Sequence, residues 1–225
     1  TLAMPTCEPD GVIVQVMRAG ICSSDVQRSM NSGFYFYPIV PGHEFCGVVT
    51  EIGKNVVDTS VGDRVAVYPL IACGECSACA SGHPNRCTDY NFLGSRTHGG
   101  YAEYVSCPSE NLVRIPDNVS FEEAALTEPY SVTLHATKRA RDFANVEAIS
   151  VMGLGPLGFM LAQWAQIAAI KTIIGFGRDE TRHEIAKDVG FSHVYDTRLD
   201  EPIATVEKIT GDEGIPPIFE CSGST

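Results

Sequence analysis

The sequence has 225 residues, of which 44% are hydrophobic, and a formal net charge of −12. This length and apolar content suffice for one large or two modest globular domains and exclude a disordered chain. The basic residues are scattered along the chain, which argues against a surface for nucleic acid or for an anionic membrane.

The first half of the chain is predicted to be rich in short β-strands. The first run ends near Cys22, where Asp25 is placed to cap a short helix. A second run follows His43 and Glu44. Taken singly, a buried cysteine is usually a packing residue, and a His-Glu pair is usually just hydrogen-bonded. The predicted strands are GVIVQV, GVVTEI, DRVAVYP, YAEYVS and NLVRIP.

The next feature is a segment with four cysteines in the spacing Cys-x2-Cys-x2-Cys-x7-Cys. The opening residues TLAMPTCEPDG lack the pattern of a secretory signal, so we expect a cytoplasmic protein whose nine cysteines stay reduced. The spacing then predicts a structural zinc bound by four thiolates, with no open position for chemistry. The alternatives are unligated thiols or a ferredoxin-type iron–sulfur cluster, in which the fourth cysteine follows after three residues. The four ligands would be Cys73, Cys76, Cys79 and Cys87.

A predicted helix follows the β-rich half. Ser120 and Glu123 have the spacing of a capping box, which begins a helix leading to Glu128. Glu128 adds an oxygen to the sulfur of Cys22 and the nitrogen of His43. Three ligands of different type, drawn from separate segments, are what a catalytic zinc with an open position requires.

From about residue 146 the pattern changes to strands that alternate with helices. The segment Ala148 to Ile170 carries no charged residue and is long enough to cross a membrane. Its glycines, its proline and its two glutamines favour instead a strand, a turn and a buried helix, so no membrane span is expected. The predicted strands of this part are EAISVM, KTIIGF and PIFECS.

The turn within this segment has the pattern G-x-G-x-x-G between a strand and a helix, which predicts a dinucleotide-binding site. The first glycine makes a tight turn, the second lets the backbone approach a pyrophosphate, and the third lets helix and strand pack closely. A proline early in the helix costs little, because its missing N–H would be unpaired there. The alternative is an ordinary strand-to-helix turn. The residues are Gly153, Gly155, Pro156, Leu157 and Gly158.

The end of the next strand bears on which dinucleotide binds. An acidic residue is expected about 20 residues after the glycine motif to hold the ribose hydroxyls of NAD. Gly177 and Arg178 stand there instead, with Asp179 next. This pair leaves room and positive charge for a 2′-phosphate and favours NADP. The alternative is that Arg178 is solvated and Asp179 caps the following helix.

These motifs together resemble the zinc-dependent medium-chain dehydrogenases, over essentially the whole chain. The order Cys22-x-Ser24-Asp25, Gly42-His43-Glu44, four cysteines, Glu128-Pro129 and the glycine motif is the order of that family. The runs GHEFCG, YNFLGSRTHGGYAEYV and EPYSVTLHA are similar to its polyol branch, and SGFYFYPIVPGHEF with DYNFLGSR to its members for sugar-alcohol phosphates.

The resemblance implies a mixed α/β chain with two domains. Residues 1–130 would form a GroES-like catalytic domain with a zinc lobe at 73–87, and residues 131–225 a Rossmann domain. The chain is also expected to be incomplete, since it opens within what resembles the first sheet and stops at the end of a Rossmann strand. The full-length protein would be a homodimer or homotetramer.

The same resemblance implies a reaction. It is hydride transfer between NAD or NADP and a secondary alcohol of a polyol or polyol phosphate such as galactitol 1-phosphate, with two zinc ions per chain. Sorbitol and L-threonine are alternative substrates. A non-catalytic zinc-binding relative and an iron–sulfur electron-transfer protein are alternatives of another class.

The family also implies roles for individual residues. Cys22, His43 and Glu128 would hold the catalytic zinc, with Glu44 as a catalytic residue or the alternative oxygen ligand. Ser24 would start a proton relay, unless its hydroxyl only caps a helix. Some relatives end this relay with a histidine where this chain has Gln27, which is no base at neutral pH, so the final proton acceptor stays open. Arg96 would meet a substrate phosphate or would simply be exposed.

Overall fold

The chain divides into two compact units, which are described separately. The computed structural model describes residues 2–211 and 217–223. The units are Thr1–Glu128 and Pro129–Thr225. The boundary suggested by the sequence, between residues 130 and 131, lies two residues further along, within helix α4 (Thr127–Arg139).

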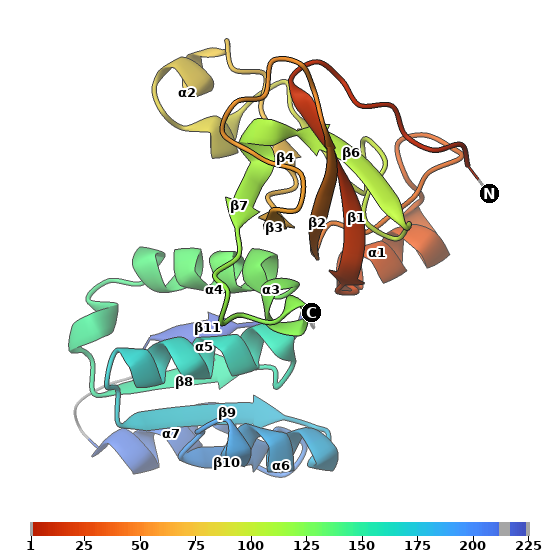
Figure 1. Ribbon diagram of the computed structural model, residues 1–225. Coiled ribbons are helices and arrows are strands. Elements are labelled where there is room, and N and C mark those ends of the chain that lie inside the picture. The colour runs from red at the N-terminus through yellow and green to blue at the C-terminus, as the bar shows by residue number, and fades with distance from the viewer. Residues whose placement is uncertain (1, 212–216, 224–225) are drawn as a thin grey trace. The chain divides into compact units, whose positions relative to one another are not determined.

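The first unit is built on a five-stranded antiparallel sheet in the order β6-β1-β2-β3-β7 (Figure 1). Val14, Phe45, Val65 and Val105 come from four of these strands and form one buried cluster together with Leu93. The β-branched side chains suit this pleated, two-sided arrangement. The strands are β1 (Gly11–Ala19), β2 (Phe45–Ile52), β3 (Arg64–Val67), β6 (Tyr104–Pro108) and β7 (Leu112–Arg114), with a 3-10 turn η3 (Ser109–Asn111) before the last.

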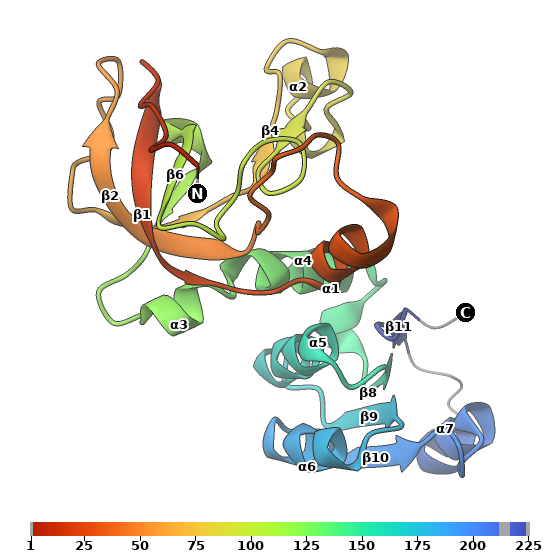
Figure 2. The ribbon, with the colours of Figure 1, turned by 90° about the vertical axis from the view of Figure 1, so that its right-hand side faces the viewer.

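A two-stranded sheet carries the four-cysteine segment. Strand β4 (Leu70–Ile71) pairs antiparallel with β5 (Asn91–Phe92), so the chain between them leaves and returns at the same place. We call residues 72–90 the zinc lobe; Figure 2 shows it in yellow, with α2, next to β4. Its helical turns are α2 (Ser77–Ala80) and η2 (Pro84–Arg86).

Short helices complete the first unit. Helix α1 (Ser23–Gln27) continues into a π-helical turn, η1 (Arg28–Ser32). Helix α3 (Phe121–Ala124) begins with the predicted capping box, in which Ser120 and Glu123 exchange hydrogen bonds. The prediction that this helix leads on to Glu128 is wrong, because α3 ends at Ala124 and α4 begins only at Thr127.

The second unit is a four-stranded parallel sheet in the order β10-β9-β8-β11, covered by helices on both faces. Residues of α4, α5 and α6 pack against Ile149, Val151 and Ile173. Val206 of α7 packs against Ile174 on the other face. The elements are β8 (Ala148–Met152), α5 (Pro156–Ile167), β9 (Thr172–Gly177), α6 (Glu180–Asp188), β10 (His193–Asp196), α7 (Pro202–Thr210) and β11 (Ile218–Glu220), with a 3-10 turn η4 (Phe143–Asn145).

This arrangement confirms the predicted fold class, a mixed α/β chain with a β-rich half and a Rossmann-type parallel sheet. The uncharged segment from residue 148 to residue 170 is strand β8, a turn and helix α5, as its glycines indicated. Among the described residues, no helix has both the length and the apolar character needed to span a membrane.

Candidate functional site

The sulfur atoms of the zinc lobe converge. Cys76 Sγ lies 3.5 Å from Cys79 Sγ and 3.9 Å from Cys87 Sγ, and Cys73 Sγ lies 4.0 Å from Cys79 Sγ. These separations are too long for disulfides, in which the sulfurs are about 2.05 Å apart. They are close to the roughly 3.8 Å expected between two thiolates bound tetrahedrally to one zinc at about 2.3 Å. The donor set therefore fits a zinc ion.

Backbone groups of the zinc lobe favour thiolates over thiols. The Cys73 N–H lies 3.2 Å from Cys87 Sγ, and the Cys76 N–H lies 3.3 Å from Cys73 Sγ. Backbone N–H groups of Cys79 and Thr88 lower the pKa of the Cys76 thiol. Such N–H donors orient metal-binding thiolates and offset part of their charge.

A second cluster forms where β1 ends and β2 begins. Cys22, His43 and Glu44 each offer a ligand atom, and these atoms all lie within 4.8 Å of one another. The Gly20 N–H donates to the Glu44 carbonyl at 2.7 Å, which ties the two segments together. A Cβ atom at Gly20 would lie 2.4 Å from Glu44 Oε2, so any larger residue there would displace the carboxylate from this position.

The predicted helix cap at Asp25 is wrong. Cys22 occupies the N-cap position of α1, and Asp25 lies inside the first turn with 3% of its surface exposed. Its carboxylate lies 3.3 Å from His43 Nδ1 and accepts a hydrogen bond of 2.7 Å from the Tyr101 hydroxyl. This hydroxyl also lies 2.9 Å from the Gly20 carbonyl. Asp25 therefore fixes the orientation of the His43 ring, which leaves Nε2 as the ligand atom.

Hydrogen bonds of His43 with Cys22 and Asp25 favour the charged forms of the cysteine and the histidine. A hydrogen bond with His43 lowers the pKa of the Cys22 thiol against the effect of burial. Burial alone would lower the pKa of His43, but hydrogen bonds with Asp25 and Cys22 raise it to about 10. Burial raises the pKa of Glu44. The site thus stabilises a thiolate, which is the form of cysteine that binds metal.

Glu128 lies close to this cluster but is not part of it. Burial raises the pKa of its carboxyl group, and the charges of His43, Glu44 and Asp25 act on it. Among the described residues, the carboxylate within 4.8 Å of Cys22 and His43 belongs to Glu44. The geometry therefore favours the oxygen ligand that the sequence analysis held as the alternative.

Three further residues singled out in the sequence lie around α1. The Ser24 hydroxyl donates to Cys22 Sγ at 3.3 Å instead of capping the helix. The Gln27 side chain accepts a hydrogen bond from Asn31 at 2.8 Å. The Arg96 guanidinium is half-buried over an aromatic ring, that of Tyr35. Ser24 and Arg96 line the same pocket of about 200 Å³, which His43 also lines.

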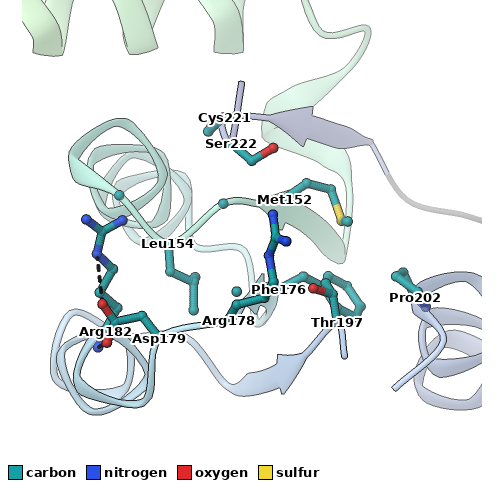
Figure 3. A pocket seen from close by; sticks show the side chains of 13 residues that line it. Met152, Leu154, Phe176, Arg178, Asp179, Arg182, Thr197, Pro202, Cys221 and Ser222 are labelled. Carbon is teal, nitrogen blue, oxygen red and sulfur yellow. Dashed lines mark hydrogen bonds and ion pairs between the residues drawn. The ribbon is translucent and has the colours of Figure 1, made fainter. Parts of the chain in front are cut away.

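The glycine motif of the second unit lines a larger pocket, of about 500 Å³ (Figure 3). Gly155 is the N-cap of α5, and Pro156 occupies its first turn. Gly153 has a φ of 106°, which favours glycine. A Cβ atom at Gly158 would lie 2.2 Å from the Gly153 carbonyl oxygen. Of the predicted cofactor residues, Gly153, Gly155 and Arg178 line the pocket, and Pro156, Leu157 and Gly158 lie in the first turn of the helix.

The carboxylate of Asp179 is already engaged at the rim of this pocket. It caps α6 by accepting hydrogen bonds from the backbone N–H groups of Thr181 and Arg182. It also forms an ion pair of 3.7 Å with the Arg182 side chain, drawn as a dashed line in Figure 3. Asp179 is therefore a helix cap, as the alternative interpretation of this segment expected, and the pocket is lined by Arg178 and Gly177 at the end of β9.

The comparison with known proteins identifies the family. Residues 8–117 match the family model described as alcohol dehydrogenase GroES-like domain, and residues 156–225 match the one described as zinc-binding dehydrogenase. The chain belongs to the zinc-dependent medium-chain alcohol dehydrogenase family. Sorbitol dehydrogenase of Bacillus subtilis is 36% identical over 229 residues, which cover 100% of this chain and 65% of that protein. The predicted family and the GroES-like first domain are confirmed.

Solved structures agree with this medium-chain dehydrogenase assignment. Galactitol-1-phosphate dehydrogenase from Escherichia coli superposes with a TM-score of 0.91 at 29% identity and covers 99% of this chain and 64% of that one. A zinc-binding dehydrogenase from Sinorhizobium meliloti, solved bound to NADP, superposes with a TM-score of 0.87 at 31% identity and covers 99% of this chain and 66% of that one. The chain spans about 65% of the length of its curated relative from Bacillus subtilis.

The functional residues missed by the sequence analysis are Tyr101 and Arg28. Tyr101 lies 76 residues from Asp25 along the chain, and nothing in the local sequence marks it as a partner of that carboxylate. Arg28 follows Gln27 and lines the pocket of Ser24 and His43. The sequence contains one indication that Arg28 lies near the site, namely its position shortly after the Cys22 to Asp25 motif.

Proposed function

We propose that this protein is a zinc-dependent oxidoreductase that transfers hydride between a secondary alcohol of a polyol or polyol phosphate and NAD or NADP. The observation that carries the proposal is the cluster of Cys22, His43 and Glu44, whose ligand atoms lie within 4.8 Å of one another beside a pocket. The names of the relatives, sorbitol dehydrogenase and galactitol-1-phosphate dehydrogenase, support the substrate class.

Cys22, His43 and Glu44 would hold the catalytic zinc, because one sulfur, one nitrogen and one oxygen leave the fourth tetrahedral position for the substrate. When bound, the zinc acts as a Lewis acid that lowers the pKa of the substrate hydroxyl. Glu128 would supply a second negative charge near the site in place of the ligand role first expected for it.

The protein's own residues would orient the ligands and move the proton. Asp25 holds His43 through Nδ1, and Tyr101 holds Asp25. Ser24 lines the pocket and would relay the proton of the substrate hydroxyl, accepting it as its own hydroxyl proton passes to solvent, to which Ser24 is exposed. Its contact with Cys22 Sγ shows that the Ser24 hydroxyl reaches the cluster.

A second, structural zinc would be bound by Cys73, Cys76, Cys79 and Cys87, which makes two zinc ions per chain. The sulfur separations of 3.5 Å, 3.9 Å and 4.0 Å support this proposal. Four thiolates fill the coordination sphere, so this ion would stabilise the lobe and take no part in the reaction.

The dinucleotide would bind over the glycine motif, with NADP preferred to NAD. The pocket includes the N-terminal end of α5, which would bind the pyrophosphate, and Arg178, which would bind a 2′-phosphate. The Asp179 carboxylate, by contrast, caps α6. We expect Arg178→Asp to lower the ratio of kcat/KM with NADP to kcat/KM with NAD by about tenfold or more. An unchanged ratio would contradict this preference.

The remaining parts of the proposal follow from the family. Residues 1–130 would be the catalytic domain and residues 131–225 the dinucleotide-binding domain, in a cytoplasmic homodimer or homotetramer.

Elemental analysis tests the whole proposal. Zinc and iron per chain are measured on purified protein, and oxidation of sorbitol, galactitol and galactitol 1-phosphate is followed with each nicotinamide cofactor. Two zincs and oxidation of at least one polyol are expected. Iron at the zinc lobe, or no turnover of any polyol, would contradict it.

A further inference from the structure

A second cationic feature lies in the pocket beside the catalytic cluster. The pocket has a volume of about 200 Å³ and is lined by Ser24, Asp25 and His43, and by Arg28, Ser95 and Arg96. The expectation for Arg96 concerned one arginine of a polar loop, whereas the structure presents two arginines from separate segments in one pocket. Both side chains are half-buried.

One aromatic ring holds both guanidinium groups. Arg96 Cζ lies 4.2 Å and Arg28 Cζ lies 5.3 Å from the centre of the Tyr35 ring. The Arg96 guanidinium also lies over Tyr90, with Cζ at 4.6 Å from the ring centre. Cation–π contact fixes the position of a guanidinium without using its N–H donors. The stacking therefore places the two charges and leaves their hydrogen-bonding edges available.

These donors have no partner in the part of the chain that the structure describes. Neither the Arg28 nor the Arg96 guanidinium forms an ion pair or a hydrogen bond with any described residue. The acidic residue of the pocket is Asp25, whose carboxylate is already bound to His43 and to the Tyr101 hydroxyl. In a chain with a net charge of −12, two arginines without an acidic partner beside a catalytic cluster indicate an anionic ligand.

We infer that Arg28 and Arg96 form a subsite for the phosphate group of the substrate, which makes the substrate a polyol phosphate. This inference rests on the proposed function and narrows its substrate class. A phosphate monoester carries a charge of about −1.5 to −2 and three acceptor oxygens, which match two guanidinium groups. A carboxylate, with one charge and two oxygens, is satisfied by a single bidentate arginine. Ser95, which also lines the pocket, offers a further hydroxyl donor.

Kinetics with a matched pair of substrates tests the subsite. The values of kcat and KM are measured for galactitol 1-phosphate and for galactitol with the zinc-loaded protein and with its Arg28→Gln and Arg96→Gln variants. Each variant is expected to lower kcat/KM for galactitol 1-phosphate by roughly 10- to 100-fold and to leave that for galactitol unchanged. The loss is expected in KM, because the phosphate is remote from the reacting carbon. Arg141→Gln, at an exposed arginine of the second unit, is the matched control.

A second pair of variants tests the role of the ring. Tyr35→Phe keeps the aromatic face under both guanidinium groups, and Tyr35→Leu removes it. We expect kcat/KM for galactitol 1-phosphate to be kept in the first variant and to fall about tenfold in the second. Equal kcat/KM values for galactitol 1-phosphate in the two variants would show that stacking on the Tyr35 ring does not position the arginines for the phosphate.

Binding measurements separate this inference from the proposed function. Calorimetric titration with galactitol 1-phosphate, inorganic phosphate and galactonate is carried out on the same variants. If no polyol is oxidised but galactitol 1-phosphate binds in an Arg28-dependent way, the subsite stands and the proposed function fails. If galactitol is oxidised but its phosphate binds no better to the wild type than to Arg28→Gln, the function stands and the subsite is wrong. Arg28-dependent binding of galactonate in preference to the phosphate would overturn the phosphate assignment.

Discussion

The two cysteine-containing clusters of the first unit differ in how the chain assembles them. All ligand atoms of the zinc lobe come from residues 73 to 87, and the lobe is closed at its base by β4 and β5. The second cluster joins Cys22, at the end of one strand, to His43 and Glu44, at the start of another. The first is therefore a local structure, and the second exists only when β1 and β2 pair.

Their surroundings differ in the same way. Backbone N–H groups within the zinc lobe point at its sulfurs. In the second cluster the supporting groups are side chains, Asp25 and Tyr101, which come from separate parts of the unit. A closed, self-supported site suits a structural ion, and a site held open by oriented side chains suits chemistry.

Replacing one cysteine by serine in each cluster is expected to have different consequences, and the larger effect on activity is expected at Cys22. We expect Cys22→Ser to remove one zinc per chain and to lower kcat/KM for polyol oxidation by about 10³-fold or more, because the Lewis acid is lost. Elemental analysis and steady-state kinetics measure the two effects. Cys7→Ser, at a half-buried cysteine outside both clusters, is the control. Full activity in Cys22→Ser would mean that the catalytic assignment is wrong.

In the zinc lobe the expected loss is structural. Cys76→Ser should also remove one zinc per chain, but its main effect should be local unfolding of residues 73 to 87, since the free energy of metal binding is the folding free energy of such a lobe. Hydrogen exchange should accelerate there and stay slow in the core of β1 and β2. Unchanged protection in the lobe would argue against a structural ion.

A smaller effect is expected from Asp25→Asn. The amide cannot hold the His43 ring as the carboxylate does, so zinc affinity at the second cluster should fall by about 10- to 100-fold with the lobe unaffected. Competition with a chelator measures the affinity of each site. Asp117→Asn, at an exposed turn, is the matched control. Equal affinities of wild type and Asp25→Asn would reduce Asp25 to a packing role.

The smallest effect is expected from Tyr101→Phe. Loss of the hydroxyl removes one hydrogen bond to Asp25 and one to the Gly20 carbonyl. A net cost of about 1 kcal/mol per bond predicts a several-fold loss of zinc affinity, weaker than that of Asp25→Asn. Tyr104→Phe, whose hydroxyl forms no hydrogen bond with a described residue, is the control. If Tyr101→Phe lost more zinc affinity than Asp25→Asn, the conclusion that Asp25 holds His43 more directly than Tyr101 does would be wrong.

Where the sequence analysis succeeded, the signal was local. The spacing of four cysteines needs only tight turns at positions such as Gly74 and Gly82, which indeed have φ values of 79° and 80°. The glycine motif likewise requires a strand, a turn and a helix that are adjacent in the chain. Its errors concerned Asp25, interpreted as a helix cap but held by His43 and Tyr101 from other segments, and the helix toward Glu128, where the capping box is present but the helix stops after one turn.

The sequence by itself determined the zinc lobe, the dinucleotide motif and the order of a β-rich half before a parallel sheet. These features depend on spacing and periodicity, which are properties of neighbouring residues. Only the tertiary structure decided that Glu44 lies beside Cys22 and His43, that Asp25 supports His43, and that Arg28 joins Arg96 over Tyr35. These contacts include side chains from separate segments, and they form only when those segments fold against one another; for Cys22 with His43 and Glu44, the pairing of β1 with β2 brings the segments together.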